Sequence, residues 1–128
     1  MKAVFINEDH GLLYAHWIAE GRKLYETRTK NTLLPLVGER VALCSTRNGK
    51  APEIVGYADV VNYFFCNAGL FEMYRPDTMI PEGSKYNKFG MRDGISGKWF
   101  YEMANPETCK PFPLPSSAIR HGRSWCEF

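Results

Sequence analysis

Four charged side chains that could do chemistry lie close together in the stretch Gly21–Arg28, whose sequence is GRKLYETR. They are Arg22, Lys23, Glu26 and Arg28. A lysine grips a phosphate while it is charged, and it acts as a base or nucleophile once it has lost its proton. A neighbouring carboxylate can orient that lysine or accept a hydrogen bond from a nucleobase. We therefore expect the functional site here.

A helix followed by a strand must position these side chains. Leu12–Glu20 is a short amphipathic stretch that predicts a helix, and Gly21 follows where a helix C-cap is expected. Leu24–Thr29 mixes β-branched and aromatic residues with charged ones, which is typical of a strand. Lys23 then lies at the corner between helix and strand. We expect this turn to gather all four charged side chains into a small volume.

Lys23 has two interpretations. The helix dipole alone favours an exposed, charged lysine at a helix C-terminus. In a cleft beside Arg22 and Arg28, the pKa of Lys23 would instead fall, because like charges and burial both favour the neutral amine. Such a lysine can act as a base or nucleophile, or it can stay charged and hold a phosphate. These roles stay open at this point.

Glu26 and Arg28 share one face of the expected strand with Leu24, because side chains alternate along an extended chain. On an open surface their ion pair would contribute roughly 0–1 kcal/mol. If Leu24 points inward, the pair lies at the rim of a cleft and its carboxylate can orient Lys23. We expect the only deep cleft with convergent charge to involve Lys23, Glu26 and Arg28.

The same stretch carries a family resemblance. Gly21, Lys23, Glu26 and Arg28 match the G-x-K-x-x-E-x-R pattern of ASCH domains, which are relatives of the PUA-like RNA-binding domains. Three further segments resemble later strands of that family, in the expected order: Val37–Leu43, Ile54–Val60 and Lys98–Met103. The likeness covers roughly three quarters of the chain. One short pattern can match by chance, but four matching segments in the expected order do not fit a chance match.

The resemblance implies an RNA- or nucleotide-binding module with a charged cleft at Gly21–Arg28. Some small ASCH relatives instead hydrolyse the amide of N4-acylated cytidine, and the lysine of their motif, which is catalytic, corresponds to Lys23. A threonine of that branch stands where this chain has Glu26, and a downstream glutamate has no clear counterpart here. Other relatives are ribonucleases, for which Lys23 and Glu26 could supply the acid and base. A protein-interaction module is a further alternative.

Short strands with one early helix predict an α+β chain, a small β-barrel of five to seven strands whose mouth the helix covers. This agrees with the PUA-like fold that the resemblance implies. The Asn48-Gly49 pair is a hairpin signal, and Gly56 is expected to form a bulge in the strand around it. Asn105-Pro106 is expected to be a turn, and the proline-rich Lys110–Pro115 an extended edge or crossover. The strands are expected at 3–6, 24–29, 40–45, 53–65, 99–103 and 124–128.

Asn67–Gly97 is expected to be a long loop with one helical turn around Leu70–Tyr74. Its aromatic side chains are expected to pack mostly on their own domain. A few aromatic and basic residues remain candidates for contacting a single nucleic-acid strand. These are Tyr86, Lys88 and Arg92 in the loop, with Arg120 and Arg123 near the end of the chain.

Composition limits the remaining classes. The 128 residues carry a net charge of +2 and are 45% hydrophobic, which suits a single globular domain over 1–128 and allows a polyanionic partner. No apolar run resembles a signal peptide or approaches the ~20 residues of a membrane-spanning helix, so we expect no membrane partner and a cytoplasmic location. His10, His16 and His121 lack the spacing of zinc ligands, and the four cysteines form no C-x-x-C pair. No metal and no cofactor are predicted.

Overall fold

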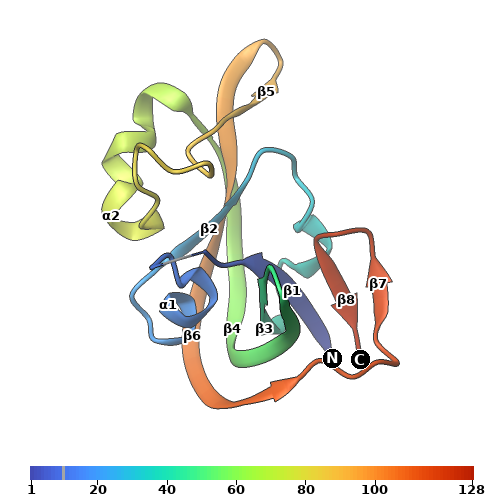
Figure 1. Ribbon diagram of the computed structural model, residues 1–128. Coiled ribbons are helices and arrows are strands. Elements are labelled where there is room, and N and C mark those ends of the chain that lie inside the picture. The colour runs from blue at the N-terminus through green and yellow to red at the C-terminus, as the bar shows by residue number, and fades with distance from the viewer. Residues whose placement is uncertain (10) are drawn as a thin grey trace.

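The computed structural model describes residues 1–9 and 11–128, which form one large sheet with short helices beside it (Figure 1). In chain order the elements are β1 (Lys2–Asn7), α1 (Tyr14–Ala19), β2 (Tyr25–Arg28), the 3-10 helix η1 (Leu34–Leu36), β3 (Arg40–Arg47), β4 (Lys50–Asn67), the 3-10 helix η2 (Ala68–Tyr74), α2 (Arg75–Thr78), β5 (Gly90–Arg92), β6 (Ile95–Pro113), β7 (Ile119–His121) and β8 (Trp125–Glu127).

The sheet has eight strands and is open. Its order is β2-β6-β4-β3-β1-β8-β7, with β5 paired to β6 off this path, and among the described strands only β1 and β3 run parallel. The described residues contain no pairing that joins β2 to β7, so the expected closed barrel is wrong, and the strand count exceeds the predicted five to seven. The two strands that sequence reasoning missed, β5 and β7, are three residues long, too short for an alternating pattern.

The two longest strands, β4 and β6, lie side by side and pair along most of their length (Figure 1). The expected irregularity at Gly56 is confirmed, because the register of β4 shifts between Ile54 and Gly56. A Cβ atom on Gly56 would lie 2.4 Å from the Glu107 carbonyl oxygen and 2.6 Å from the Ala19 Cβ. A glycine is therefore needed where helix α1, β4 and β6 meet.

Asn105-Pro106 does not form the expected turn. β6 continues through it as one strand of 19 residues, and one extra residue of β6 is absorbed between the pairs Tyr57↔Glu107 and Asp59↔Ala104. Asn105 takes a left-handed conformation with φ of 50°, and its side-chain amide donates to Asp59 at 2.8 Å. A β-bulge therefore replaces the turn, because the asparagine accepts positive φ and satisfies its own polar group.

Helix α1 packs on a face of the sheet, against β4, β3 and β6, rather than over a barrel mouth. Its buried side chains are Tyr14, Ala15, Ile18 and Ala19, the spacing of one face of a helix. Glycine at Gly21, with φ of 78°, ends the helix as expected. The helix thus delivers the chain into β2 at a fixed point beside the core.

The segment between β4 and β6 folds onto the core. The predicted helical turn is confirmed as η2, which continues into α2. Phe71 is buried, and Tyr74, Tyr86 and Phe89 pack against the core, as expected for loop aromatics. Among the residues described, no helix has the length and apolar character needed to cross a membrane.

The close approach at Gly56 yields a prediction. Gly56→Ala should lower the free energy of unfolding by about 1–3 kcal/mol or more, because the added methyl group overlaps backbone and helix atoms that cannot both move away. Gly83→Ala is the matched control, since a Cβ there meets nothing within 4 Å. Urea denaturation measures both changes, and equal midpoints for the two variants would contradict this account of the packing.

Candidate functional site

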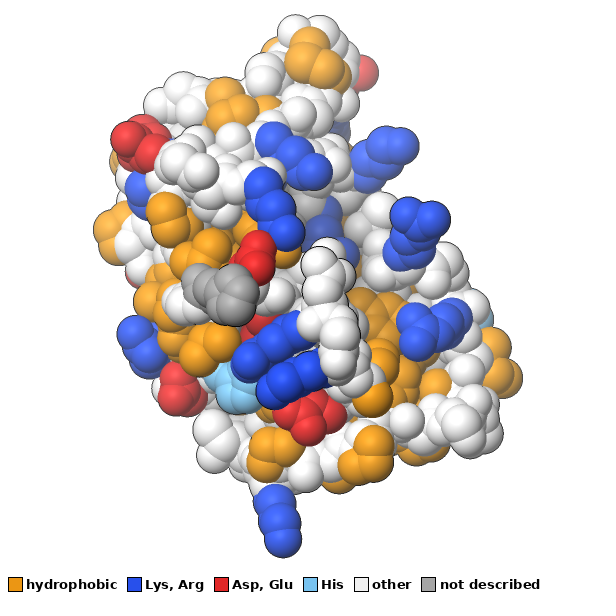
Figure 2. Space-filling model, in the orientation of Figure 1, with side chains coloured by type: hydrophobic (Ala, Val, Ile, Leu, Met, Phe, Trp, Pro, Cys, Tyr) orange, Lys and Arg blue, Asp and Glu red, His pale blue; other side chains and the backbone are white. Residues whose placement is uncertain are grey.

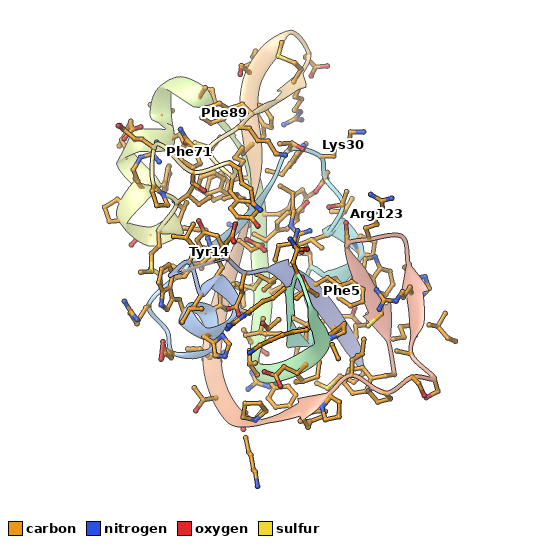
Figure 3. All side chains as sticks on the ribbon, viewed as in Figure 1. Phe5, Tyr14, Lys30, Phe71, Phe89 and Arg123 are labelled. Atoms are coloured by element: carbon orange, nitrogen blue, oxygen red, sulfur yellow. The ribbon has the colours of Figure 1, made fainter. Side chains whose placement is uncertain are left out.

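A cavity of about 220 Å³ lies where the end of β1, the start of α1, β2 and the beginning of β6 meet. We call it the lysine cavity. In Figure 3, Tyr14 and Phe5 mark its walls from helix α1 and strand β1, and Arg123 lies beyond them towards β8. The polar and charged residues that line it are Asn7, Tyr14, Lys23, Glu26, Thr27, Arg28, Thr29, Tyr86, Lys88, Lys98 and Arg123.

Lys23 is held inside by the turn that ends helix α1. The backbone amides of Arg22 and Lys23 both donate to the Trp17 carbonyl, so the turn is tight and the lysine faces inward. Its side chain is 1% exposed, and Nζ donates to the Thr78 carbonyl. Nζ also lies 4.0 Å from the Glu26 carboxylate and 4.8 Å above the Tyr14 ring.

The surroundings of Lys23 lower its pKa to about 8. Burial is the largest cause, because a charged amine loses its hydration there. The carboxylate of Glu26 raises the pKa in part, while the positive charges of Lys98 and Arg28 lower it. Near neutral pH a fraction of Lys23 is therefore a neutral amine with a free lone pair.

Arg28 ties the carboxylate of Glu26 to strand β1. Its Nη2 donates to Glu26 Oε2 at 3.1 Å and to the Phe5 carbonyl at 2.6 Å. The backbone amide of Thr27 donates to the other carboxylate oxygen of Glu26 at 3.1 Å. Leu24 is 40% exposed, so the idea that an inward Leu24 buries this pair is wrong. The pair is enclosed by β1 and by Lys23.

Lys98, at the start of β6, is a second buried lysine that sequence reasoning missed. It is 3% exposed and donates to Thr27 Oγ1 at 3.0 Å and to the Tyr86 carbonyl at 2.7 Å. Burial lowers its pKa to about 8, against an opposing effect of Glu26. A lysine directly before a run of buried aromatic strand residues was the available signal, since an inward-facing strand position seldom carries a charge without a partner.

The Tyr14 hydroxyl is a buried polar group in the cavity wall. Tyr14 is 4% exposed, and its hydroxyl makes no hydrogen bond within the described residues. Ser84 lies near it but not in hydrogen-bonding geometry. A buried donor without a partner is costly, so this hydroxyl is available to a polar atom of a ligand.

The structure brings some of the predicted site residues together and separates others. Of the four charged residues in the Gly21–Arg28 stretch, Lys23, Glu26 and Arg28 converge, but Arg22 lies over the Trp17 ring and pairs with Glu20, so the expected gathering of all four is wrong.

The candidates from later in the chain divide in the same way. Tyr86, Lys88 and Arg123 line the cavity. Arg92 stacks over Phe65 and Trp99, and Arg120 over Phe5, outside it. Figure 2 shows several Lys and Arg side chains gathered on this face of the molecule.

Comparison with known proteins places this arrangement in a known fold. No family model matches the sequence, and no curated protein matches it. Three solved structures of ASCH from Zymomonas mobilis do match. The first has a TM-score of 0.66 at 19% identity and covers 88% of this chain and 73% of that one. A serine-to-alanine variant of that protein has a TM-score of 0.71 at 16% identity, covering 98% and 87%. A tyrosine-to-phenylalanine variant has a TM-score of 0.64 at 19% identity, and the match covers 89% of this chain and 77% of that one.

The chain has the ASCH fold. Within this fold, the residues of the Gly21–Arg28 pattern have identifiable structural roles. The glycine permits the left-handed end of helix α1, the lysine enters the cavity, and the glutamate and arginine form the pair beside it. Each residue of the pattern thus has a different local task.

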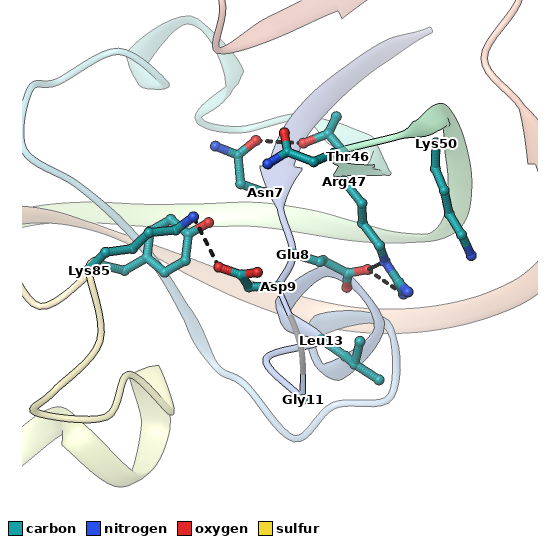
Figure 4. Close-up of a pocket in the computed structure, with 11 residues that line it drawn as sticks. Asn7, Glu8, Asp9, Gly11, Leu13, Thr46, Arg47, Lys50 and Lys85 are labelled. Carbon is teal, nitrogen blue, oxygen red and sulfur yellow. Dashed lines mark hydrogen bonds and ion pairs between the residues drawn. The ribbon is translucent and has the colours of Figure 1, made fainter.

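A second hollow adjoins the lysine cavity, so the expectation of a single deep charged cleft is wrong. It has a volume of about 520 Å³ and is lined mainly by polar side chains between the end of β1 and the β3–β4 hairpin (Figure 4). We call it the polar cleft, and its lining includes Asn7, Asp9, Thr46, Arg47, Lys50, Lys85 and Tyr86. Over residues 1–9 and 11–128, no group of three or more His, Cys, Asp and Glu could hold a metal. His10 lies outside the described residues.

The buried state of Lys23 predicts a pH effect on stability. Its pKa is about 8 in the folded protein and near the ordinary 10.5 in the unfolded chain, so between these values the unfolded state binds more protons. Wild type should therefore gain stability relative to Lys23→Met as the pH rises, by about 2 kcal/mol between pH 7 and pH 9.5.

Urea denaturation of both proteins at the two pH values measures this difference. The exposed Lys110→Met is the control, and its difference from wild type should stay constant. A difference between wild type and Lys23→Met that stays the same at both pH values would show that Lys23 titrates normally in the folded protein.

Proposed function

We propose that this chain is a small amidohydrolase that admits one N4-acylated cytosine unit into the lysine cavity. The observation that carries the proposal is Lys23, a fully buried lysine at the cavity wall whose pKa is lowered to about 8. A buried amine that is partly neutral near pH 7 suits a general base far better than a structural ion, which would keep its charge. The substrate class follows from the resemblance of Gly21–Arg28 to the ASCH pattern.

The reaction that fits this lysine is hydrolysis of the exocyclic amide. The neutral Nζ of Lys23 takes a proton from a water molecule while the water oxygen attacks the acyl carbon. The resulting tetrahedral oxyanion then collapses, the carbon–nitrogen bond breaks, and the Lys23 ammonium returns its proton to the departing nitrogen of the base. The products are a carboxylic acid and the free cytosine amine.

Other groups of the cavity supply the positioning and the charge. Nζ of Lys23 donates to the Thr78 carbonyl, which fixes the direction of its lone pair. Lys98 lines the same cavity, and its ammonium can stabilise the oxyanion. The unpartnered hydroxyl of Tyr14 can donate to the ring of the base. The small volume of the cavity, about 220 Å³, supports a single base as its occupant.

Ribonuclease chemistry fits the same residues less well. It would require Glu26 to exchange protons as an acid or base opposite Lys23. The carboxylate of Glu26 instead accepts hydrogen bonds on both oxygens, from Arg28 and from the Thr27 amide. A carboxylate held in this way is an orienting group for the lysine. For the protein-interaction alternative, no specific contact of the site offers support.

The first test is turnover of N4-acetylcytidine by wild type and by Lys23→Met, followed by release of cytidine. Wild type should release cytidine at a rate that increases with pH up to about pH 8, as the ammonium of Lys23 loses its proton, and that decreases at higher pH, as Lys98 loses the charge that stabilises the oxyanion. Lys23→Met, which has similar length but no amine, should lose at least about a hundredfold in kcat. Lys110→Met should match wild type. A wild-type protein that releases no cytidine at any pH contradicts the amidohydrolase.

The second test changes the pKa of the base without removing it. Glu26 raises the pKa of Lys23, so Glu26→Gln should lower that pKa and move the rising limb of the pH–rate profile to lower pH. Arg22→Gln removes a charge outside the cavity and should leave the profile in place. If the pH–rate profile of Glu26→Gln is the same as that of wild type, a group other than Lys23 determines the pH dependence of the rate.

A further inference from the structure

The polar cleft has an internal framework built around Glu8. The carboxylate of Glu8 is fully buried and accepts hydrogen bonds from Ser45 Oγ at 2.6 Å, from the His16 amide at 3.1 Å and from Arg47 Nη2 at 3.1 Å, with the His16 ring nitrogen at 2.8 Å. Burial alone would raise the pKa of Glu8, but the hydrogen bonds from Ser45 and His16 outweigh it and lower the pKa overall. Glu8 thus fixes the guanidinium of Arg47 at the wall of the cleft.

The charges around this framework favour an anion. Arg47, Lys50 and Lys85 line the cleft, against the carboxylates of Glu8 and Asp9. Figure 4 shows these side chains on both sides of the hollow, with Lys85 paired to Asp9 at 3.0 Å and Lys50 unconnected to the other residues drawn. The buried charge of Glu8 is already balanced by the guanidinium of Arg47. The accessible part of the cleft therefore carries positive charge together with amide and hydroxyl groups, which suits a sugar and a phosphate.

The two hollows share walls. Asn7 and Tyr86 line both the polar cleft and the lysine cavity. Lys88 and Arg123, which line the lysine cavity, extend the basic character of this face beyond the cleft. A ligand that places a base in the small cavity can therefore continue into the larger, more polar hollow without crossing the protein surface elsewhere.

We propose that the polar cleft is a subsite for the phosphate-bearing nucleotide next to the one whose base enters the lysine cavity. The substrate is then an N4-acylated cytidine within a single-stranded polynucleotide rather than a free nucleoside. This inference rests on the proposed function for the identity of the base. It adds a binding site, its ligand class and a preference among substrates, none of which the chemistry of Lys23 requires.

The test compares three acetylated substrates: N4-acetylcytidine, its 5′-monophosphate, and a short single-stranded RNA with one central N4-acetylcytidine. For wild type, kcat/KM should be at least about tenfold higher for the RNA than for the nucleoside. The variant Lys50→Gln/Lys85→Gln should lose most of this preference and keep wild-type activity on the nucleoside, because neither lysine lines the lysine cavity. The control Arg22→Gln/Lys110→Gln removes the same charge elsewhere and should retain the preference.

Several outcomes would overturn the inference. Equal kcat/KM for the nucleoside and the RNA would do so, and so would a Lys50→Gln/Lys85→Gln protein with an unchanged preference. Equal kcat/KM for the monophosphate and the RNA would show that the cleft binds only a terminal phosphate, and would overturn the polynucleotide as its ligand.

Binding of the unacetylated RNA, measured by fluorescence anisotropy, gives a readout that needs no turnover. The double variant should bind it about tenfold more weakly, with a salt slope reduced by roughly 0.7 for each lost phosphate contact. If no substrate is turned over, only the amidohydrolase proposal is overturned. The difference in RNA binding between wild type and the double variant then still tests the subsite.

Discussion

The hydrogen bonds of Arg28 hold together a part of the structure that the sheet leaves open. β1 pairs with β8 only as far as Val4, and no strand pairing joins the rest of that edge to β2 in the described chain. The guanidinium of Arg28 spans this opening, from the Glu26 carboxylate to the Phe5 carbonyl. It therefore sets the distance between the two strands and the orientation of Glu26, and through Glu26 it affects the charge of Lys23. A closed barrel would have hydrogen-bonded these strands directly and left no cavity between them.

Two buried lysines around one carboxylate form an arrangement that folding alone would not favour. Each ammonium loses hydration on burial, and a single Glu26, already bonded to Arg28, cannot compensate for both. Sites of this kind are found where a protein needs a group that gains and loses a proton near neutral pH. The hydrogen bonds of Lys23 to a backbone carbonyl and of Lys98 to Thr27 and Tyr86 fix both amines in position.

Sequence reasoning recovered the features that depend on neighbouring residues. The glycine after α1, strands β3 and β4, the irregularity at Gly56 and the convergence of Lys23, Glu26 and Arg28 all follow from short-range pattern. It failed where distant segments decide the outcome. Lys98 reaches the site through a bond to Thr27, 71 residues away, and the polar cleft depends on how β1 lies beside the β3–β4 hairpin. Asn105 becomes a bulge only because Asp59 lies opposite to receive its amide.

The pairing of β2 with β6 has a consequence for how the chain folds. The β3–β4 hairpin closes through a short turn and can form early, whereas β2 must wait for a strand that follows it by some seventy residues. The walls of the lysine cavity come from β1, β2 and β6, so the cavity exists only after the slow, long-range contacts have formed. Until then both lysines remain hydrated and fully charged. The two amines are therefore buried only when β2 pairs with β6, and a partly folded molecule has no lysine with a lowered pKa.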